Sequence, residues 1–300
     1  MNIFKTFSKA ILLIPLLVIH FFGKMYSTLL QLIKPNLGFY WCDTIAAENK
    51  NLIQEVIHKS TTQGEAKLKI YTPNWICRYR VTSFSTKEPE TLEWIDQYGG
   101  NGPLFDIGAN VGLYSMYFAA TKKQKVYAFE PSFFNLALLA KNIYVNNLQD
   151  RIHVVANPLS ETNQFSKFSL STTEEGGALS TFGVDFGYDG KALQKSLEYK
   201  TLGFSLDYLI SQKIVPELPA MIKVDVDGIE HLILAGAVET LKSPICRTVL
   251  IEVNQSFQEQ ATKISELLKS CGFSPELNNL PSQIGTGEFS EVSNQIWVKR

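Results

Sequence analysis

Residues 104–112 read LFDIGANVG, and this stretch decides the fold. The first four residues are apolar apart from Asp106, which is typical of a buried strand. Gly108 and Gly112 permit a tight turn from that strand into a helix over residues 112–120, and they let a ligand approach the backbone. Since ligands of open α/β sheets bind at the carboxyl ends of the strands, we expect this turn to lie at a ligand site.

Outward from this stretch, short apolar strands alternate with helical patterns. Strands are predicted at 125–130, 152–156, 221–226, 247–253 and 294–298, and helices at 132–146, 231–241 and 258–270. Such alternation predicts a doubly wound α/β domain over residues 76–300, in which helices cover both faces of a parallel sheet. Residues 157–220 break the alternation, and a long insertion of this kind usually carries function or covers a site.

The chain before residue 76 follows a different pattern. Residues 43–75 have apolar side chains at nearly helical spacing, so we expect a helical extension. Ala10–Phe22 is a 13-residue apolar run preceded by Lys5 and Lys9, and at about 1.5 Å per residue it is too short to cross a bilayer. Two interpretations stay open: residues 1–35 anchor the protein on a membrane surface, or they form a helix packed on the body.

Composition excludes several classes of protein. With 28 basic and 29 acidic residues the net charge is −1, so we expect no nucleic-acid partner. The four cysteines are scattered and form no CxxC pair, which argues against a disulfide framework or a zinc site. We therefore expect a cytoplasmic enzyme with reduced thiols, in contact with the inner face of the membrane if residues 1–35 bind it.

A second acidic residue, Glu130, ends the next predicted strand, 18 residues after Gly112. It is placed to accept hydrogen bonds from ribose hydroxyls. Dinucleotide folds seat a pyrophosphate on G-x-G-x-x-G, whereas the pattern here is G-x-N-x-G, with Asp106 just before it. A carboxylate repels pyrophosphate but suits S-adenosylmethionine, which carries a sulfonium and an ammonium group and no phosphate. The plain alternative is a glycine-rich turn that binds nothing.

Longer motifs carry a family resemblance. FDIGANVGLYSMYFA, followed by VYAFEPSFFNLALLAKNIYVNN, resembles the S-adenosylmethionine-dependent methyltransferases of the FkbM type. MIKVDVDGIEHLILAGA resembles the second signature of that family, and VLIEVN resembles its fifth strand. The resemblance covers about residues 76–300 and leaves residues 1–75 uncovered. It implies a Rossmann-like class I methyltransferase sheet of seven strands whose last strand, 294–299, is antiparallel.

The resemblance also implies a set of cofactor-binding residues. Four of them would form the loop around the methionine end of the cofactor: Asp106, Gly108, Asn110 and Gly112. Glu130 would bind the ribose, and Asn157 would lie near the adenine. The chain departs from the family at Asp227, where Glu is more common.

Transfer of a methyl group from a sulfonium to a hydroxyl needs alignment and an activated nucleophile. A base or a metal is expected, because an alcohol is a poor nucleophile at neutral pH. Asp225 ends the strand 221–226, and Asp227 and Glu230 follow, so these three are the catalytic candidates. Lys223 shares the strand face of Asp225 and is placed to pair with a carboxylate.

Two other interpretations of these carboxylates remain. A divalent metal held by Asp225, Glu252 and Asn254 is the less favoured one. The other is that Asp225 or Asp227 only caps a helix. The favoured function is methyl transfer to a hydroxyl of a small molecule, sugar or glycolipid. The alternatives are a nicotinamide-dependent oxidoreductase and a non-catalytic scaffold with the methyltransferase fold.

Overall fold

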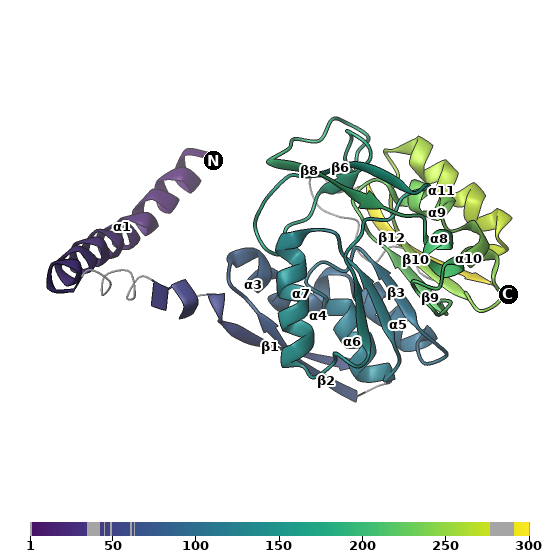
Figure 1. The fold of residues 1–300 in the computed structure, drawn as a ribbon, viewed down its shortest axis with the longest axis horizontal. Helices are drawn as coiled ribbons and strands as arrows, with labels where there is room; N and C mark the ends of the chain where they lie inside the picture. The colour runs from purple at the N-terminus through teal and green to yellow at the C-terminus, as the bar shows by residue number, and fades with distance from the viewer. Residues whose placement is uncertain are drawn as a thin grey trace. The chain divides into compact units, whose positions relative to one another are not determined.

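The computed structural model describes residues 2–34, 43–44, 46–48, 50–60, 62, 64–276 and 291–299. The chain divides into two compact units, Met1–Leu52 and Ile53–Arg300. The second unit therefore begins before residue 76, the predicted start of the catalytic domain. Figure 1 shows the elements of both units.

The first unit is dominated by one long helix, α1 (Asn2–Ile33). An N-terminal helix is therefore present, but it lies before residues 43–75, where the helical extension was expected. From residue 18 onward its large apolar side chains are mostly exposed: Val18, Ile19, Phe21, Phe22, Met25, Tyr26, Leu29, Leu32 and Ile33. In the part of the chain that the structure describes, no helix combines the length and the apolar character needed to cross a membrane.

The second unit opens with a β-hairpin, where the sequence had predicted helix. Strands β1 (Ile53–Ser60) and β2 (Gly64–Tyr71) pair antiparallel, so the helix expected over 43–75 is wrong for these residues. In β2 the buried side chains alternate with exposed ones: Ala66, Leu68 and Ile70 face the core. Short apolar runs fit both helical and strand periods, and here packing against the core selects the strand period.

The central sheet has seven strands, as the family resemblance implied. Their spatial order is β11 (Phe273–Pro275), β12 (Val292–Lys299), β10 (Thr248–Asn254), β9 (Met221–Val224), β3 (Leu104–Ile107), β4 (Val126–Phe129) and β5 (Ile152–Val155). Strand β12 runs antiparallel to both of its neighbours, while β3, β4, β5, β9 and β10 pair parallel. The prediction of a final antiparallel strand is confirmed.

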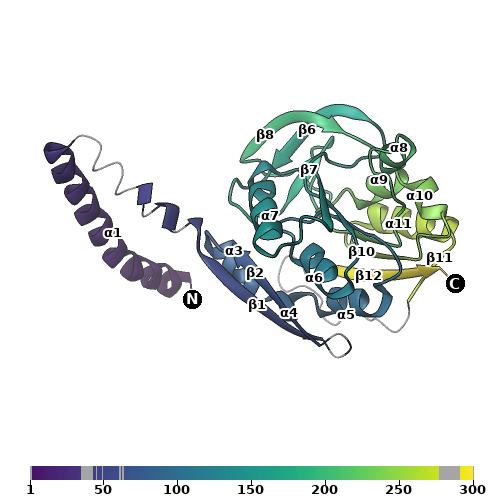
Figure 2. The same cartoon turned by 60° about the horizontal axis from the view of Figure 1, so that its bottom comes forward.

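Helices cover both faces of this sheet, which makes the fold doubly wound (Figures 1 and 2). One apolar core includes side chains of β2 and of α3 (Trp75–Thr82), α4 (Phe84–Lys87), α5 (Pro89–Tyr98), α6 (Leu113–Lys122) and α7 (Phe133–Val145). The other includes side chains of α8 (Leu206–Ser211), α9 (Glu230–Ala235), α10 (Val238–Lys242) and α11 (Gln258–Ser270). Strand β3 contributes to both cores, because successive side chains point to opposite faces.

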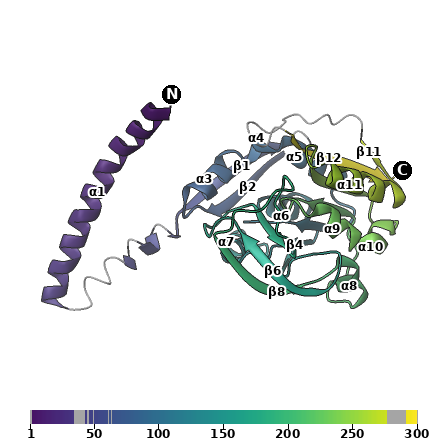
Figure 3. The same ribbon diagram turned by 90° about the horizontal axis from the view of Figure 1, so that it is seen from above.

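The insertion 157–220 forms a small sheet of its own. Its strands β6 (Gln164–Leu170), β7 (Ser180–Phe182) and β8 (Leu197–Gly203) pair antiparallel in the order β7-β6-β8. Figure 3 shows β6 and β8 side by side, outside the central sheet. Phe168, Thr181 and Phe182 of this sheet line the pocket described next. The insertion thus covers part of the predicted ligand site.

Candidate active site

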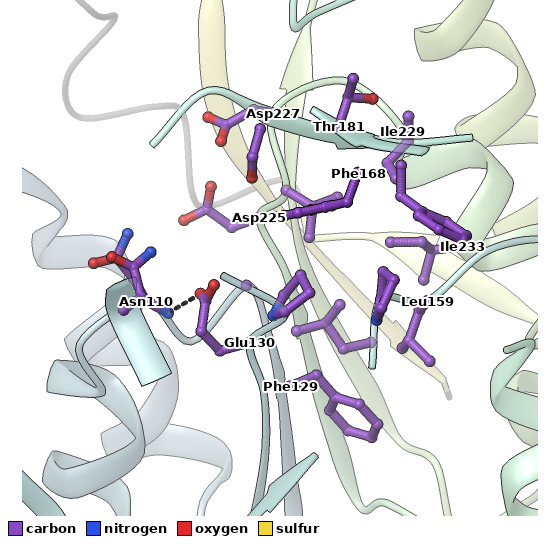
Figure 4. Close-up of a pocket in the computed structure, with 18 of the residues that line it drawn as sticks. Asn110, Phe129, Glu130, Leu159, Phe168, Thr181, Asp225, Asp227, Ile229 and Ile233 are labelled. Atoms are coloured by element: carbon purple, nitrogen blue, oxygen red, sulfur yellow. Dashed lines mark hydrogen bonds between the residues drawn. The ribbon is translucent and has the colours of Figure 1, made fainter. Parts of the chain in front are cut away.

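A pocket opens at the carboxyl ends of β3, β4 and β9. Gly108 and Asn110 line it from the first loop, and Glu130 lines it from the end of β4. Asp225 and Asp227 line it from the turn after β9 (Figure 4). The structure therefore brings candidate residues of the cofactor loop together with candidate residues of the acceptor side.

Residue 108 requires glycine because of its backbone angle and because of a close neighbouring atom. Gly108 has φ +85°, and a Cβ built on it would lie 1.8 Å from the carbonyl oxygen of Asp225. Asn110 also has a positive φ, of 52°, and its side-chain oxygen accepts a hydrogen bond from the amide of Val111. The loop and the end of β9 are thus in direct contact, which leaves no room for a side chain at residue 108.

Glu130 is buried and holds the loop in place. Its carboxylate accepts hydrogen bonds from the backbone N–H groups of Asn110 and Ser132, each at 2.8 Å. Burial raises the pKa of Glu130 to about 7, although these two hydrogen bonds oppose the shift. Glu130, the residue predicted to bind the ribose, therefore also anchors the loop.

The other predicted cofactor residues differ in their access to the pocket. Asn157 lines it, and its side-chain amide donates a hydrogen bond to the carbonyl of Leu202 at 3.1 Å. Gly112 and Asp106 do not line it. Asp106 is fully buried and accepts a hydrogen bond from the hydroxyl of Ser115 at 2.5 Å, so it supports helix α6 from within the domain.

Asp225 is paired with a buried lysine. The Nζ atom of Lys223 lies 2.7 Å from Oδ2 of Asp225, which confirms the pairing that the strand alternation predicted. The side chain of Lys223 is 2% exposed and that of Asp225 is 25% exposed. Burial has the largest single influence and would raise the pKa of Asp225, but the charges of Lys223, Lys87 and Arg80 and the hydrogen bond from Lys223 together lower it.

Asp227 has the opposite electrostatic character. Its φ is +62°, and its Oδ2 accepts the backbone N–H of Leu179 at 2.7 Å. Burial, followed by the charge of Asp225, raises the pKa of Asp227 to about 6. Figure 4 shows both carboxylates on the same side of the pocket. Two neighbouring carboxyl groups with pKa values pushed apart are typical of a division of roles at an active site.

Glu230, the third catalytic candidate, lies outside the pocket lining. Its carboxylate accepts hydrogen bonds from the amides of Val226 and Gly228 and from the side chain of Gln260. It is 1% exposed, and burial raises its pKa to about 7. These contacts tie the carboxylate of Glu230 to the turn before α9.

The structure also shows the surroundings of Asn254 and Glu252, which were considered as metal ligands. Asn254 donates a hydrogen bond to the carbonyl of Tyr188 and accepts one from the amide of Ser256. Burial and the charges of Asp225 and Asp227 raise the pKa of Glu252 well above its usual range. Among the residues that the structure describes, no group of three His, Cys, Asp or Glu side chains has a metal-binding arrangement.

The sequence predicted that the insertion 157–220 carries function or covers a site, but it did not predict the contacts of segment 174–178, a strap that closes over the loop. The carbonyl of Gly177 accepts hydrogen bonds from the side-chain amides of Asn110 at 2.7 Å and Asn135 at 3.2 Å. Arg80 donates to the carbonyl of Gly176 at 2.8 Å. The adjacent glycines of the strap were the available signal, but nothing in the sequence indicates their partners.

The residue types in the pocket fit S-adenosylmethionine. Three carboxylates line it, those of Glu130, Asp225 and Asp227, and the described lining contains no lysine or arginine. An acidic lining suits a sulfonium and an ammonium group and disfavours a pyrophosphate. The donor and acceptor set thus agrees with the cofactor expected from the sequence.

Comparison with solved structures gives methyltransferases at low similarity. Precorrin-6y C5,15-methyltransferase from Geobacter metallireducens GS-15 is 12% identical, with a TM-score of 0.42, over 71% of this chain and 87% of that one. An rRNA methylase from Streptococcus thermophilus is 12% identical, with a TM-score of 0.42, over 70% and 94%. SMU.1697c, a putative methyltransferase from Streptococcus mutans in complex with SAH, is 12% identical, with a TM-score of 0.43, over 71% and 97%.

A search of curated proteins found no match. The sequence model of one family, described as "Methyltransferase FkbM domain", matches residues 106–275. This match covers more than half of the 300 residues and includes the loop, Glu130 and the turn after β9. It confirms the resemblance seen in the sequence motifs: the chain belongs to the FkbM methyltransferases, with S-adenosylmethionine as the methyl donor.

Proposed function

We propose that this protein transfers the methyl group of S-adenosylmethionine to a hydroxyl oxygen of a small molecule, sugar or glycolipid. The observation that carries the proposal is the pair Asp225 and Asp227, which lines the same pocket as the glycine loop. A hydroxyl must lose its proton as it attacks a methyl group, and carboxylates beside the cofactor loop can accept it.

The cofactor side of the proposal uses the residues predicted from the sequence. Gly108 and Asn110 border the methionine end, Glu130 accepts from the ribose hydroxyls, and Asn157 lies toward the adenine. Asp106 and Gly112 act indirectly, by supporting the loop and helix α6. The cofactor, when bound, supplies the electrophilic methyl group. The protein supplies alignment and excludes water beneath the strap.

On the acceptor side, we assign Asp227 as the general base that takes the proton of the acceptor hydroxyl. Its pKa of about 6 lies near the working pH, where a general base is most effective. Asp225 has a lowered pKa, is paired with Lys223, and is therefore a weaker base. It would act as a fixed negative charge that orients the acceptor. Glu230 is left out of the catalytic set, because its hydrogen bonds are used within the turn.

We further propose where the catalytic domain begins, what residues 1–35 contact and which class of acceptor is excluded. The catalytic domain begins at β1, because the hairpin contributes Val56, Leu68 and Ile70 to the core. Residues 1–35 contact the inner face of the membrane from the cytoplasm, with the exposed apolar side chains of α1 as the contacting groups. The acceptor is not a nucleic acid, in keeping with the net charge of −1.

The test is a screen of acceptors with S-adenosylmethionine labelled in the methyl group. Sugars, glycolipids and hydroxylated small molecules are compared with amines, thiols and RNA. Asp227→Asn should lower turnover by roughly 10²–10⁴-fold, while the affinity for S-adenosylhomocysteine, measured by calorimetry, changes little. Asp150→Asn, at an exposed loop position, is the matched control. Labelling of RNA, amines or thiols but of no hydroxyl would contradict the proposal.

A further inference from the structure

Lys223 is a buried cation that lies behind the pocket lining and contacts Asp225. Its residue exposure is 1%, and its Nζ atom lies 2.7 Å from Asp225 and 5.3 Å from the centre of the Tyr114 ring. In the parallel pairing of β3 and β9, Lys223 stands directly opposite Asp106. A buried ammonium is costly unless it is paired, so this side chain is committed to the carboxylates beside it.

Several other charged groups face Asp225 from neighbouring elements. On the acidic side these are Asp106 of β3, Asp227 of the same turn, and Glu252 of β10. All three feel the charge of Asp225, as does the hydroxyl of Tyr114 in α6. The anion of Asp225 therefore needs a compensating cation if it is to persist in this surrounding.

Two further cations approach Asp225, but both have other partners. Lys87 pairs with Glu88 at 2.6 Å and its side chain is 47% exposed. Arg80 donates to the carbonyl of Gly176 in the strap. Both lower the pKa of Asp225 less than Lys223 does. Among the described groups, Lys223 is the one cation that is both buried and in contact with Asp225.

We propose that Lys223 is a positioning residue that holds Asp225 as an oriented anion at the edge of the pocket. The inference rests on the proposed function, in which Asp225 orients the acceptor and Asp227 takes its proton. The anion of Asp225 in turn raises the proton affinity of Asp227. Lys223 thus acts through Asp225 on the base, without touching the acceptor or the cofactor.

The first experiment follows the carboxyl ¹³C signals of aspartate in the whole protein as the pH is changed. Asp225→Asn and Asp227→Asn assign the two signals. In the wild type, the midpoint of Asp225 should lie below its ordinary value of 3.8. In Lys223→Met it should rise by about one to three pH units, the usual effect of a close opposite charge. Lys223→Arg keeps the charge and should stay near the wild type.

The matched control is Lys125→Met. Lys125 also forms an ion pair, with Glu217, but its side chain is 50% exposed and the pair lies outside the pocket lining. This variant should leave the Asp225 midpoint unchanged. If Lys223→Met fails to fold, the titrations of the wild type and of Lys223→Arg still test the proposal. A wild-type Asp225 that titrates at or above 3.8, or an Asp225 midpoint that is the same in wild type and Lys223→Met, overturns the proposal.

The second experiment is the pH profile of methylation with an acceptor found in the screen. Without Lys223, full ionisation of the Asp225–Asp227 pair is harder, so the acid limb of kcat/KM should move to higher pH by about one unit or more. Lys223→Arg should restore it. An unmoved acid limb in a folded Lys223→Met contradicts the coupling to Asp227. If the screen finds no acceptor, this result contradicts the proposed function alone, since the carboxyl titration does not depend on turnover.

Discussion

At the scale of single residues, Glu130 and Glu230 show how similar burial leads to different roles. Burial raises the pKa of each to about 7. Glu130 follows β4 and lines the pocket, whereas Glu230 begins α9 and turns its carboxylate toward Val226 and Gly228. The same residue type is thus a ligand candidate at one strand end and a structural group at another.

Glu130→Gln should lower the affinity for S-adenosylhomocysteine by roughly tenfold, because ribose hydroxyls lose a charged acceptor. Since the pKa of Glu130 is about 7, the wild-type affinity should also fall as the pH drops below 7, and the Gln variant should lack this dependence. Calorimetry at several pH values measures both effects. Glu161→Gln, at an exposed position, serves as the control. Equal affinities of wild type and Glu130→Gln would remove Glu130 from the ribose site.

Glu230→Gln tests a structural role through the pH dependence of stability. The pKa of Glu230 rises from 4.5 to about 7 on folding, so the folded state binds the proton more tightly. That contribution to the free energy of unfolding is complete below pH 4.5 and is lost as the pH rises through 7. Relative to the wild type, Glu230→Gln should therefore gain stability between pH 4.5 and pH 8, as urea unfolding will measure. A constant difference across this range would show that Glu230 does not titrate there.

At the scale of elements, the loop after β3 and the end of β9 form one unit. Their backbones meet at Gly108, where the carbonyl of Asp225 occupies the space of a side chain. The amide of Asp225 donates to the carbonyl of Ile107, which continues the pairing of the two strands. Cofactor loop and acceptor carboxylate are thus held together by main-chain contacts.

Gly108→Ala should destabilise the protein by roughly 3 kcal/mol or more, because its Cβ would collide with a main-chain oxygen. Gly64→Ala is the matched control. Gly64 also has a positive φ, of 79°, but no atom lies within 4 Å of its added Cβ. It should therefore cost only the backbone strain, about 1–2 kcal/mol. Thermal unfolding of both variants measures the difference, and equal losses of stability would mean that the strands move apart freely at residue 108.

At the scale of the whole molecule, the chain joins a catalytic unit to a long N-terminal helix. The last sixteen residues of α1, 18–33, expose large apolar side chains on most turns. Lys24 and Lys34 lie among and after them. A helix of this composition is a candidate for the interface of an anionic membrane.

The full chain should bind liposomes that contain anionic lipid, more weakly as salt is added, because the lysines contribute a screened attraction. A chain that starts at residue 36 should stay in the buffer. Co-sedimentation with anionic and with neutral liposomes measures both. Lys213→Gln in the full chain, which removes a charge from the catalytic unit, is the control and should bind like the wild type. Equal partitioning of the full and shortened chains would favour a helix that packs on protein.

The sequence by itself determined the parts of this protein that depend on local rules. The loop at 104–112 follows from turn chemistry, since glycine is the residue that fits its backbone. The common strand face of Lys223 and Asp225 follows from strand alternation, which places residues two apart on one face. The seven-strand sheet and its antiparallel last strand came from the family resemblance and were confirmed.

Tertiary structure alone decided the rest, because those features depend on contacts between distant segments. The hairpin 53–71 was predicted as helix, and burial against α6 and α7 selects the strand period instead. The direction of the Glu230 side chain depends on Gln260, thirty residues later. The strap 174–178 is fixed by Asn110, Asn135 and Arg80, none of which is near it in sequence. Periodicity and turn residues carry no information on such partners, whereas packing does.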